Sequence, residues 1–437
     1  MLNIPISKQL IAEKISEMNL PSIGKISIRE LIKLVNSIEL ATHVPFIHME
    51  MGVPGLPPSQ IGIQAEIAAL NKGVASIYSG IEGLPALKDE LSRFAKLFMN
   101  LEIKPSGCIP TIGSMEAAFA SFMLINACTE GKNTTLFIDP GFPVQKQQIR
   151  TLGLPFETFD IFHYRGEKLK EKLESYLSKG NISCMIYSNP NNPSWITFTE
   201  KELQIIGELS VKYDVIVLED LAYFGMDYRQ DYSKPGVAPF QPSVANYTPW
   251  YILMISGSKV FSYAGQRIAG LLISDKLASR NYPHLTKIYS NSNFAHSFSY
   301  GAMYVLTAGV PQSPQYAFAA MLKAANDGTY NFLNEVKDYS KRAEKLKNIF
   351  VKNGFYLVYD QDEGQPLADG FYFTVNYPNM TGEQLLQELL SYGVSAISLQ
   401  ITGSTMEGIR ACVSQIKDDD YEKLEDRMKL FFENHPI

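Results

Sequence analysis

Reactive side chains follow four short apolar runs in the middle of the chain, each within a few positions of a run's end. Phe142 follows the first run and Asn192 follows the second. Asp220 and Tyr223 follow the third run, and Lys259 follows the fourth. A carboxylate, a phenol and a lysine amine are groups that transfer protons or attack a carbonyl carbon. The spacing therefore predicts one polar site that is shared by four elements.

The elements that must position these side chains read as strands alternating with helices. The helix between the second and third runs begins at a capping box, Thr199–Glu202, and carries an apolar face. Short apolar strands that alternate with helices are typical of a largely parallel sheet covered on both faces. Such sheets bind ligands beyond the carboxyl ends of their strands. The apolar runs, with a fifth after the lysine, are Leu136–Ile138, Cys184–Tyr187, Val215–Leu218, Ile252–Ile255 and Ala269–Ile273.

The two ends of the chain predict a second, smaller domain. Ser27–Glu30 is another capping box and opens a helix near the N-terminus. A long helical region near 316–353 leads into strands at Phe371–Val375 and Gly408–Val413, which is an α+β pattern. We therefore expect an α/β fold with a large, mostly parallel sheet and a smaller α+β domain. The expected limits are 1–60 for an N-terminal arm and part of the small domain, 61–310 for the large domain, and 311–437 for the C-terminal small domain.

Composition and charge argue against several classes of protein. The 437 residues are 46% hydrophobic and 19% charged, and the net charge of −6 comes without any polybasic run, which argues against a nucleic-acid partner. The four cysteines form no CxxC pair and have no histidine at metal-ligand spacing, so neither a disulfide framework nor a metal site is expected. The first residues lack the apolar stretch of a signal peptide, and no apolar segment is long enough to span a membrane. We expect a cytoplasmic protein without membrane contact.

The ordered set of motifs resembles the fold-type I pyridoxal-phosphate enzymes, and among them the class I and II aminotransferases. The most specific motif is Ser256–Arg267, in which S-x-x-K is followed by an arginine eight residues beyond the lysine. Each residue alone would be read as a turn, cap or surface residue, and only the order of the set carries the resemblance. It extends from a Pro/Gly-rich turn at Gly52 to Arg410. The remaining motifs are Ile77–Gly80 with Gly83–Leu87, Gly113–Ala117, Asn189–Pro193 and Asp220–Tyr223.

The resemblance implies roles toward the ring of pyridoxal phosphate. Lys259 would form a Schiff base with the cofactor aldehyde and, once displaced by substrate, would carry the proton. Asp220 would keep the pyridine nitrogen protonated, so that the ring withdraws electrons. Asn192 and Tyr223 would donate hydrogen bonds to the phenolic oxygen. Phe142 would stack on the ring, although a tyrosine is frequent at this position in the family.

The resemblance assigns a second group of residues to the cofactor phosphate. A guanidinium can grip phosphate oxygens bidentately, and backbone N–H groups at a helix N-terminus form a cradle for anions. Tyr78 would reach the phosphate from the neighbouring subunit, so the resemblance implies a homodimer with shared sites. The residues of the chain itself that are implied for the phosphate are Ser256, Arg267, Gly113, Ser114 and Met115.

The resemblance also implies the substrates. Arg410 would clamp the α-carboxylate of an amino acid, with Asn192 and Gly52 beside it, and the reaction would move the amino group to a 2-oxo acid. Besides Phe142, Trp195 departs from the family pattern, because it stands where a glycine usually makes a tight turn. We therefore expect the loop after Asn192 to be reshaped.

Other activities fit parts of the same pattern. A C–S lyase, a decarboxylase or a cyclising synthase shares the motifs, because small differences in the pocket decide which reaction step comes after Cα deprotonation. A sensor that uses this fold without catalysis would carry a DNA-binding winged helix, but the roughly fifty residues before Gly52 lack a basic recognition helix. A nucleotide-binding enzyme would need G-x-G-x-x-G or a P-loop, and neither pattern occurs.

Overall fold

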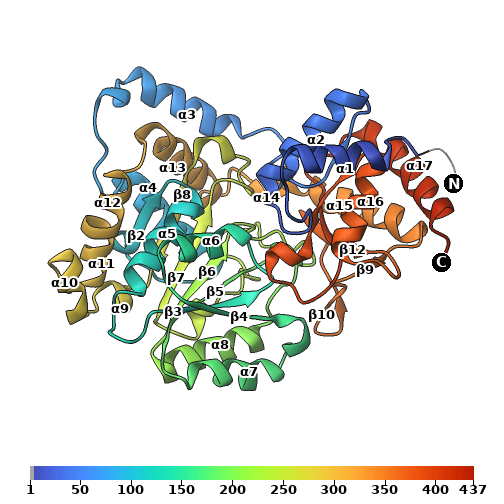
Figure 1. The fold of residues 1–437 in the computed structure, drawn as a ribbon. Helices are drawn as coiled ribbons and strands as arrows, with labels where there is room; N and C mark the ends of the chain where they lie inside the picture. The colour runs from blue at the N-terminus through green and yellow to red at the C-terminus, as the bar shows by residue number, and fades with distance from the viewer. Residues whose placement is uncertain (1–3) are drawn as a thin grey trace.

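The larger part of the molecule is built on a seven-stranded sheet, seen in a computed structural model that describes residues 4–437 (Figure 1). The strand order is β2-β8-β7-β6-β5-β3-β4. All neighbours from β7 to β4 are parallel, and β8 runs antiparallel to both of its neighbours. The predicted, mostly parallel sheet is therefore confirmed. Its strands are β2 (Cys108–Thr111), β3 (Thr134–Asp139), β4 (Phe156–Asp160), β5 (Ile182–Ser188), β6 (Ile216–Leu221), β7 (Tyr251–Ser256) and β8 (Ala269–Ile273).

Helices cover this sheet, which explains why its central strands are mostly apolar. Every residue of β3, β6, β7 and β8 is buried. α5 packs against β7 and β8, α8 packs against β6, and α7 lies beside α8 at the bottom of Figure 1. Both hydrogen bonds of the capping box predicted at Thr199–Glu202 are present at the start of α8. The helices of this part include α3 (Gln60–Asn71), α4 (Pro85–Met99), α5 (Gly113–Ile125), α6 (Pro143–Thr151), α7 (Lys168–Leu177) and α8 (Glu200–Tyr213).

The smaller part joins both ends of the chain around a four-stranded antiparallel sheet of order β14-β15-β12-β9. β1 (Ile47–His48) pairs with β13 (Val394–Ser395), so the start of the chain belongs structurally with its end. Figure 1 shows both termini on this side of the molecule. The capping box predicted at Ser27–Glu30 opens α2. The other elements here are α1 (Lys8–Glu17), α2 (Ile28–Thr42), α15 (Asp338–Lys352), α16 (Gly382–Ser391), α17 (Asp418–Asn434), β9 (Tyr356–Leu357), β12 (Tyr372–Asn376), β14 (Ile397–Ser398) and β15 (Ile409–Cys412).

The helical region expected near 316–353 consists of three helices. α13 (Gln312–Asn326) ends before Gly328, whose φ of +72° stops a helix, and α14 (Phe332–Val336) begins at the cap residue Asn331. α13 packs against α3 and α4 of the larger part, whereas α15 packs against α17 and β12. Among residues 4–437, no helix has both the length and the apolar character to cross a membrane. Short elements complete the chain: α9 (Asp275–Ala278), α10 (Thr286–Tyr289), α11 (Phe294–His296), the π-helix η7 (Ser297–Met303), α12 (Tyr304–Thr307), β10 (Gln361–Asp362) and β11 (Gln365–Pro366).

Buried polar contacts hold the smaller part over the carboxyl edge of the large sheet. Asp160, the last residue of β4, accepts a hydrogen bond from the backbone N–H of Thr405 at 2.8 Å. Asp362 of β10 lies between two arginines of the larger part, 2.9 Å from Arg165 and 3.0 Å from Arg229. At this contact the Asp362 carboxylate is therefore paired with the guanidinium groups of Arg165 and Arg229. The edge where the reactive residues were expected is therefore enclosed by both parts.

Candidate active site

Lys259 lies beyond the end of β7, where the larger and smaller parts meet. Its Nζ donates to the carbonyl of Gly52 and stands 5.6 Å from the centre of the Phe371 ring. The turn that carries it is fixed by Ser256, whose Oγ accepts from the N–H of Ser258 at 3.0 Å. Burial lowers the pKa of the Lys259 amine to about 8. Roughly a tenth of the amine is then neutral, and so nucleophilic, at pH 7.

Asp220 is a buried carboxylate near the end of β6, with 7% of its surface exposed. It accepts hydrogen bonds from the Gln145 amide at 3.0 Å and from the N–H of Ala222 at 3.1 Å. Burial raises the pKa of the Asp220 carboxyl group to about 6. Both partners are neutral, so a positive charge placed beside this carboxylate would be strongly stabilised.

Arg410 is a buried arginine that faces the same edge from β15, with 1% of its surface exposed. Its Nη1 donates to Asn192 Oδ1 at 3.3 Å, and its Nη2 donates to the carbonyl of Glu50. Both acceptors are neutral, and Arg410 Nε has no hydrogen-bond partner within the described chain. Asn192 is itself held through its N–H by Ser188 Oγ at 3.1 Å. A buried guanidinium with an unused N–H is suited to bind a carboxylate.

A cradle for an anion lies at the N-terminus of α5. Gly113 has a φ of +68°, and a Cβ on it would lie 2.6 Å from Arg267 Nη2, so only glycine lets the guanidinium approach. Arg267 is held by a hydrogen bond from Nη1 to the carbonyl of Ala264 at 3.0 Å. Ser114 Oγ is buried and, as far as residues 4–437 go, has no hydrogen-bond partner. The N–H groups at the start of α5 and one guanidinium therefore converge, an arrangement that suits a phosphate.

Three other residues expected at the site differ in how the structure holds them. Phe142 is partly buried and precedes α6, and its neighbour Gly141 donates to the carbonyl of Thr402 at 2.9 Å. The carbonyl of Met115 accepts from the Gln148 amide at 2.8 Å. Tyr78 is 97% exposed on the outer surface of the chain, so the single chain does not bring it to the other site residues.

Trp195 occupies a buried position behind the site. Its φ is +64°, its exposure is 1%, and its ring meets the ring of Tyr223 edge-on at 5.2 Å. Gly370 lies so close to the indole that a Cβ there would overlap it. The smaller part therefore carries a glycine where this large side chain needs room, and the indole packs against the phenol of Tyr223.

Sequence reasoning missed three residues that support the site. Gln145 contacts Asp220, Glu50 offers its carbonyl to Arg410, and Tyr372 contacts Tyr223 through its hydroxyl. Helical spacing could place Gln145 on α6 but not opposite a particular strand. Tyr372 lies in a strand that the apolar pattern did predict, and only its alignment with the strand of Arg410 could have marked it.

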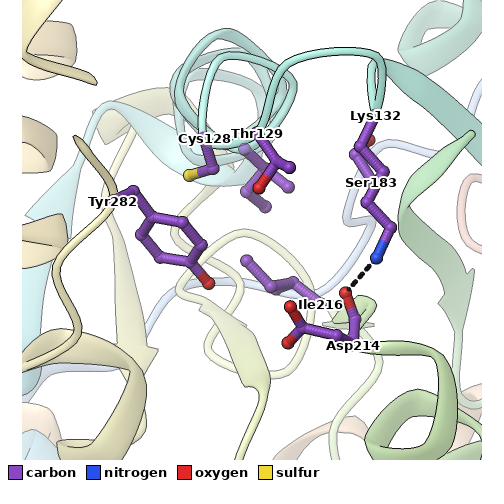
Figure 2. A pocket seen from close by; sticks show the side chains of 8 residues that line it. Cys128, Thr129, Lys132, Ser183, Asp214, Ile216 and Tyr282 are labelled. Atoms are coloured by element: carbon purple, nitrogen blue, oxygen red, sulfur yellow. Dashed lines mark hydrogen bonds between the residues drawn. The ribbon is translucent and has the colours of Figure 1, made fainter. Parts of the chain in front are cut away.

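A different pocket lies at the opposite edge of the sheet (Figure 2). It is lined by Ser183 and Ile216, which lie at the amino ends of β5 and β6. Lys132 Nζ donates to the carbonyls of Tyr213 and Asp214, both at 2.7 Å, at the end of α8. A lysine in this place donates hydrogen bonds to the last carbonyls of the helix, and its positive charge interacts favourably with the helix dipole. This is a structural role.

A family model described as aminotransferase class I and II matches residues 46–428. Among curated proteins, a probable aspartate aminotransferase of Methanocaldococcus jannaschii is 24% identical over 345 residues, covering 77% of this chain and 82% of that protein. A putative aminotransferase of Bacillus subtilis is 23% identical over 397 residues, covering 90% and 92%. An asparagine–oxo-acid transaminase of Streptococcus mutans is 26% identical over 262 residues, covering 56% and 63%.

Solved structures share the fold at low sequence identity. Aspartate aminotransferase from Thermus thermophilus with maleate superposes with a TM-score of 0.73 at 14% identity, covering 96% of this chain and 98% of that one. Aspartate aminotransferase from Thermotoga maritima gives a TM-score of 0.74 at 17% identity, covering 96% and 99%. The expected fold-type I architecture is therefore confirmed over nearly the whole chain.

Proposed function

Because this chain belongs to the aminotransferase class I and II family, whose members use pyridoxal phosphate, we propose that Lys259 holds the cofactor. The observation that carries the proposal is the environment of the Lys259 amine. It is buried at the end of a central strand, and burial lowers its pKa to about 8. An amine that is partly neutral at physiological pH can bond to an aldehyde, which a fully protonated lysine cannot do.

The polar groups around Lys259 fit pyridoxal phosphate. Among residues 4–437, the hydrogen-bond partners of Asp220 are all neutral, and a protonated ring nitrogen would be the positive charge that it lacks. Ser114 Oγ lacks a partner within residues 4–437 and adjoins Gly113, whose Cα faces Arg267, so the three match a phosphate. These features support the assignment of ring nitrogen and phosphate to opposite ends of one site.

The residues of the chain divide the work of amino transfer. Pyridoxal phosphate supplies an aldehyde that takes up the amino group and a ring that withdraws electrons from the substrate Cα. Lys259 accepts and returns the proton at its Nζ, next to the Gly52 carbonyl. Asp220 would hold the proton on the ring nitrogen, and Tyr223 and Asn192 would donate to the phenolic oxygen. Phe142 would cover one face of the ring, and Ser256 and Met115 would contact the phosphate.

The substrate is held by its α-carboxylate. Within residues 4–437, Arg410 Nε has no hydrogen-bond partner and the acceptors of Nη1 and Nη2 are neutral, so an incoming carboxylate would supply the missing negative charge. Asn192 and Gly52 line the same end of the site. The curated relatives are named for different amino acids, aspartate and asparagine among them. Assays with a panel of amino donors therefore identify the side chain of the substrate.

We also propose that a second copy of the chain completes each site. Ile77 and Tyr78 are 64% and 97% exposed, and Tyr304 and Val305 of α12 are 55% and 70% exposed. Gln312 donates to the carbonyl of Ile77 at 2.9 Å, which ties this segment to the region just after α12. Large apolar side chains gathered on one edge are typical of an interface, and a symmetric dimer is the commonest closed assembly. Tyr78 would then reach the partner's phosphate cradle.

Chemical trapping tests the assignment of Lys259. The loaded protein is reduced with borohydride and digested, and the peptide that carries the cofactor mass is identified. We expect that peptide to contain Lys259, and we expect Lys259→Arg to carry no cofactor mass. A reduced cofactor found on any other lysine would overturn the assignment. Separately, a panel of amino acids with 2-oxoglutarate or pyruvate measures which amino group is moved.

A further inference from the structure

Tyr372 lies on the same face of the small sheet as Arg410. β12 and β15 are antiparallel neighbours, in which Tyr372 is opposite Cys412 and Thr374 is opposite Arg410. Side chains alternate between the two faces of a strand, so residues two positions apart share a face. The ring of Tyr372 accordingly lies against the guanidinium, with Arg410 Cζ 4.4 Å from the ring centre. This distance is within the range of a cation–π contact.

The hydroxyl of Tyr372 contacts Tyr223, the residue proposed to tune the cofactor. The oxygens of Tyr372 and Tyr223 are 2.7 Å apart, which is hydrogen-bond distance, and the two rings meet at 76°. The surroundings leave the Tyr372 hydroxyl little freedom. A Cβ on Gly52 would overlap it, and Trp195 packs edge-on against both phenol rings, at 5.2 Å and 6.1 Å.

The positions of the two oxygens allow either phenol to donate, and the charges around them favour one direction. Burial raises the pKa of both phenols, so both are neutral and only one of them donates to the other. The cation of Arg410 lies over the ring of Tyr372 and draws electron density from its hydroxyl, which makes Tyr372 the better donor. Tyr223 then accepts, and its own hydrogen stays free for a different acceptor.

We propose that Tyr372 is a positioning residue, which donates to Tyr223 and thereby directs the Tyr223 hydrogen toward the phenolic oxygen of the bound cofactor. The inference rests on the proposed role of Tyr223 at that oxygen. A hydroxyl that accepts a hydrogen bond becomes a stronger donor, because the two bonds polarise one another. The ring of Tyr372 also supports Arg410, so one side chain orients both the substrate clamp and the phenol that tunes the cofactor.

The test is a pH titration of the loaded enzyme in the absence of substrate, followed by the visible absorbance of the bound cofactor. A weaker donor leaves more negative charge on the phenolic oxygen, and that charge keeps the neighbouring proton to higher pH. We therefore expect Tyr223→Phe to move the midpoint of the absorbance change upward. Tyr372→Phe should move it in the same direction by less, on the order of half a pH unit.

The double variant separates positioning from a general structural effect. Once Tyr223 lacks its hydroxyl, adding Tyr372→Phe should shift the midpoint no further. Tyr377→Phe is the matched control, because Tyr377 follows the same strand, is buried, and donates to the His435 carbonyl away from the site. Its midpoint should equal that of the unaltered protein.

The kinetic readout uses a second variant. Tyr372→Phe keeps the ring under Arg410 and should lower kcat several-fold with little change in KM, whereas Tyr372→Leu removes the ring and should raise KM as well. If Tyr372→Phe leaves the midpoint unchanged, or shifts it equally with and without the Tyr223 hydroxyl, the inference is wrong and the proposed function stands. If Tyr223→Phe itself shifts nothing, the assigned role of Tyr223 is wrong.

Discussion

The amide nitrogen of Gln145 lies 3.0 Å from the carboxylate of Asp220, so a neutral group from α6 is the side-chain partner of a buried charge on β6. Burial raises the pKa of Asp220 from 3.8 to about 6. A shift of this size corresponds to about 3 kcal/mol of destabilisation of the cofactor-free protein at neutral pH. The cost is absent below pH 3.8, grows as pH rises, and is complete above about pH 6, because the folded state binds the proton more tightly.

Replacing this carboxylate should separate stability from activity. Asp220→Asn removes the buried charge, and the Gln145 amide can turn over to accept a hydrogen bond from the new side chain. We expect the free energy of unfolding of the cofactor-free protein to rise at pH 7, by up to about 3 kcal/mol, with turnover reduced by orders of magnitude. Urea unfolding at pH 4 and pH 7 is the measurement, and the gain should shrink at pH 4. A gain that is equal at both pH values would contradict the account.

The lowered pKa of Lys259 predicts that this lysine reacts with aldehydes at a lower pH than an ordinary lysine. In cofactor-free protein, formaldehyde with cyanoborohydride should methylate Lys259 with a midpoint near pH 8. The same lysine in urea-unfolded protein serves as the control and should show the ordinary midpoint of about 10.4. The pKa is lowered because burial penalises the charged amine, so the neutral form gains as pH rises through 8. Peptide mass spectrometry at each pH gives both curves, and matching midpoints would refute the prediction.

Replacing Arg410 should weaken the binding of substrates that carry an α-carboxylate more than the binding of simple amines. Arg410→Lys loses the forked N–H pair, and we expect the KM for amino acids to rise roughly 100-fold, or ~3 kcal/mol. Simple amines without a carboxylate should be affected far less. Arg427→Lys is the control, because Arg427, like Arg410, donates one hydrogen bond from each Nη but lies away from the site. Equal losses for amines and amino acids would assign Arg410 to the fold.

Tyr78 should act across subunits. We expect Tyr78→Ala and Lys259→Ala to be weak alone, and we expect activity to return when the two are coexpressed. In a mixed dimer, one site carries both lesions and the other carries neither, which holds only if Tyr78 serves the partner's site. Differential tags isolate the mixed species for assay. Mixed dimers without activity would place Tyr78 in its own site, and a fully active monomer would remove the shared-site model.

The sequence alone determined the large sheet and the edge at which the reactive residues gather. Strands buried on both faces are mostly apolar, so their apolar runs could be recognised in the sequence, and parallel strands place their carboxyl ends at one edge. Lys259 and Asp220 could therefore be assigned to the same edge without knowledge of their contacts. The capping boxes at α2 and α8 could be recognised because each depends on two residues that are three positions apart in the sequence.

Only the tertiary structure decided which side chains meet across long separations. Tyr223 and Tyr372 are 149 residues apart, and their contact depends on how the smaller part packs over the large sheet. The reversed direction of β8 was equally hidden, because an apolar run reads the same in either direction. The exposure of Tyr78 was hidden as well, because burial depends on the packing of the whole chain and on the partners of its surface. Patterns over a few residues fix local elements, whereas the partners of Asp220, Tyr223 and Arg410 are fixed by packing.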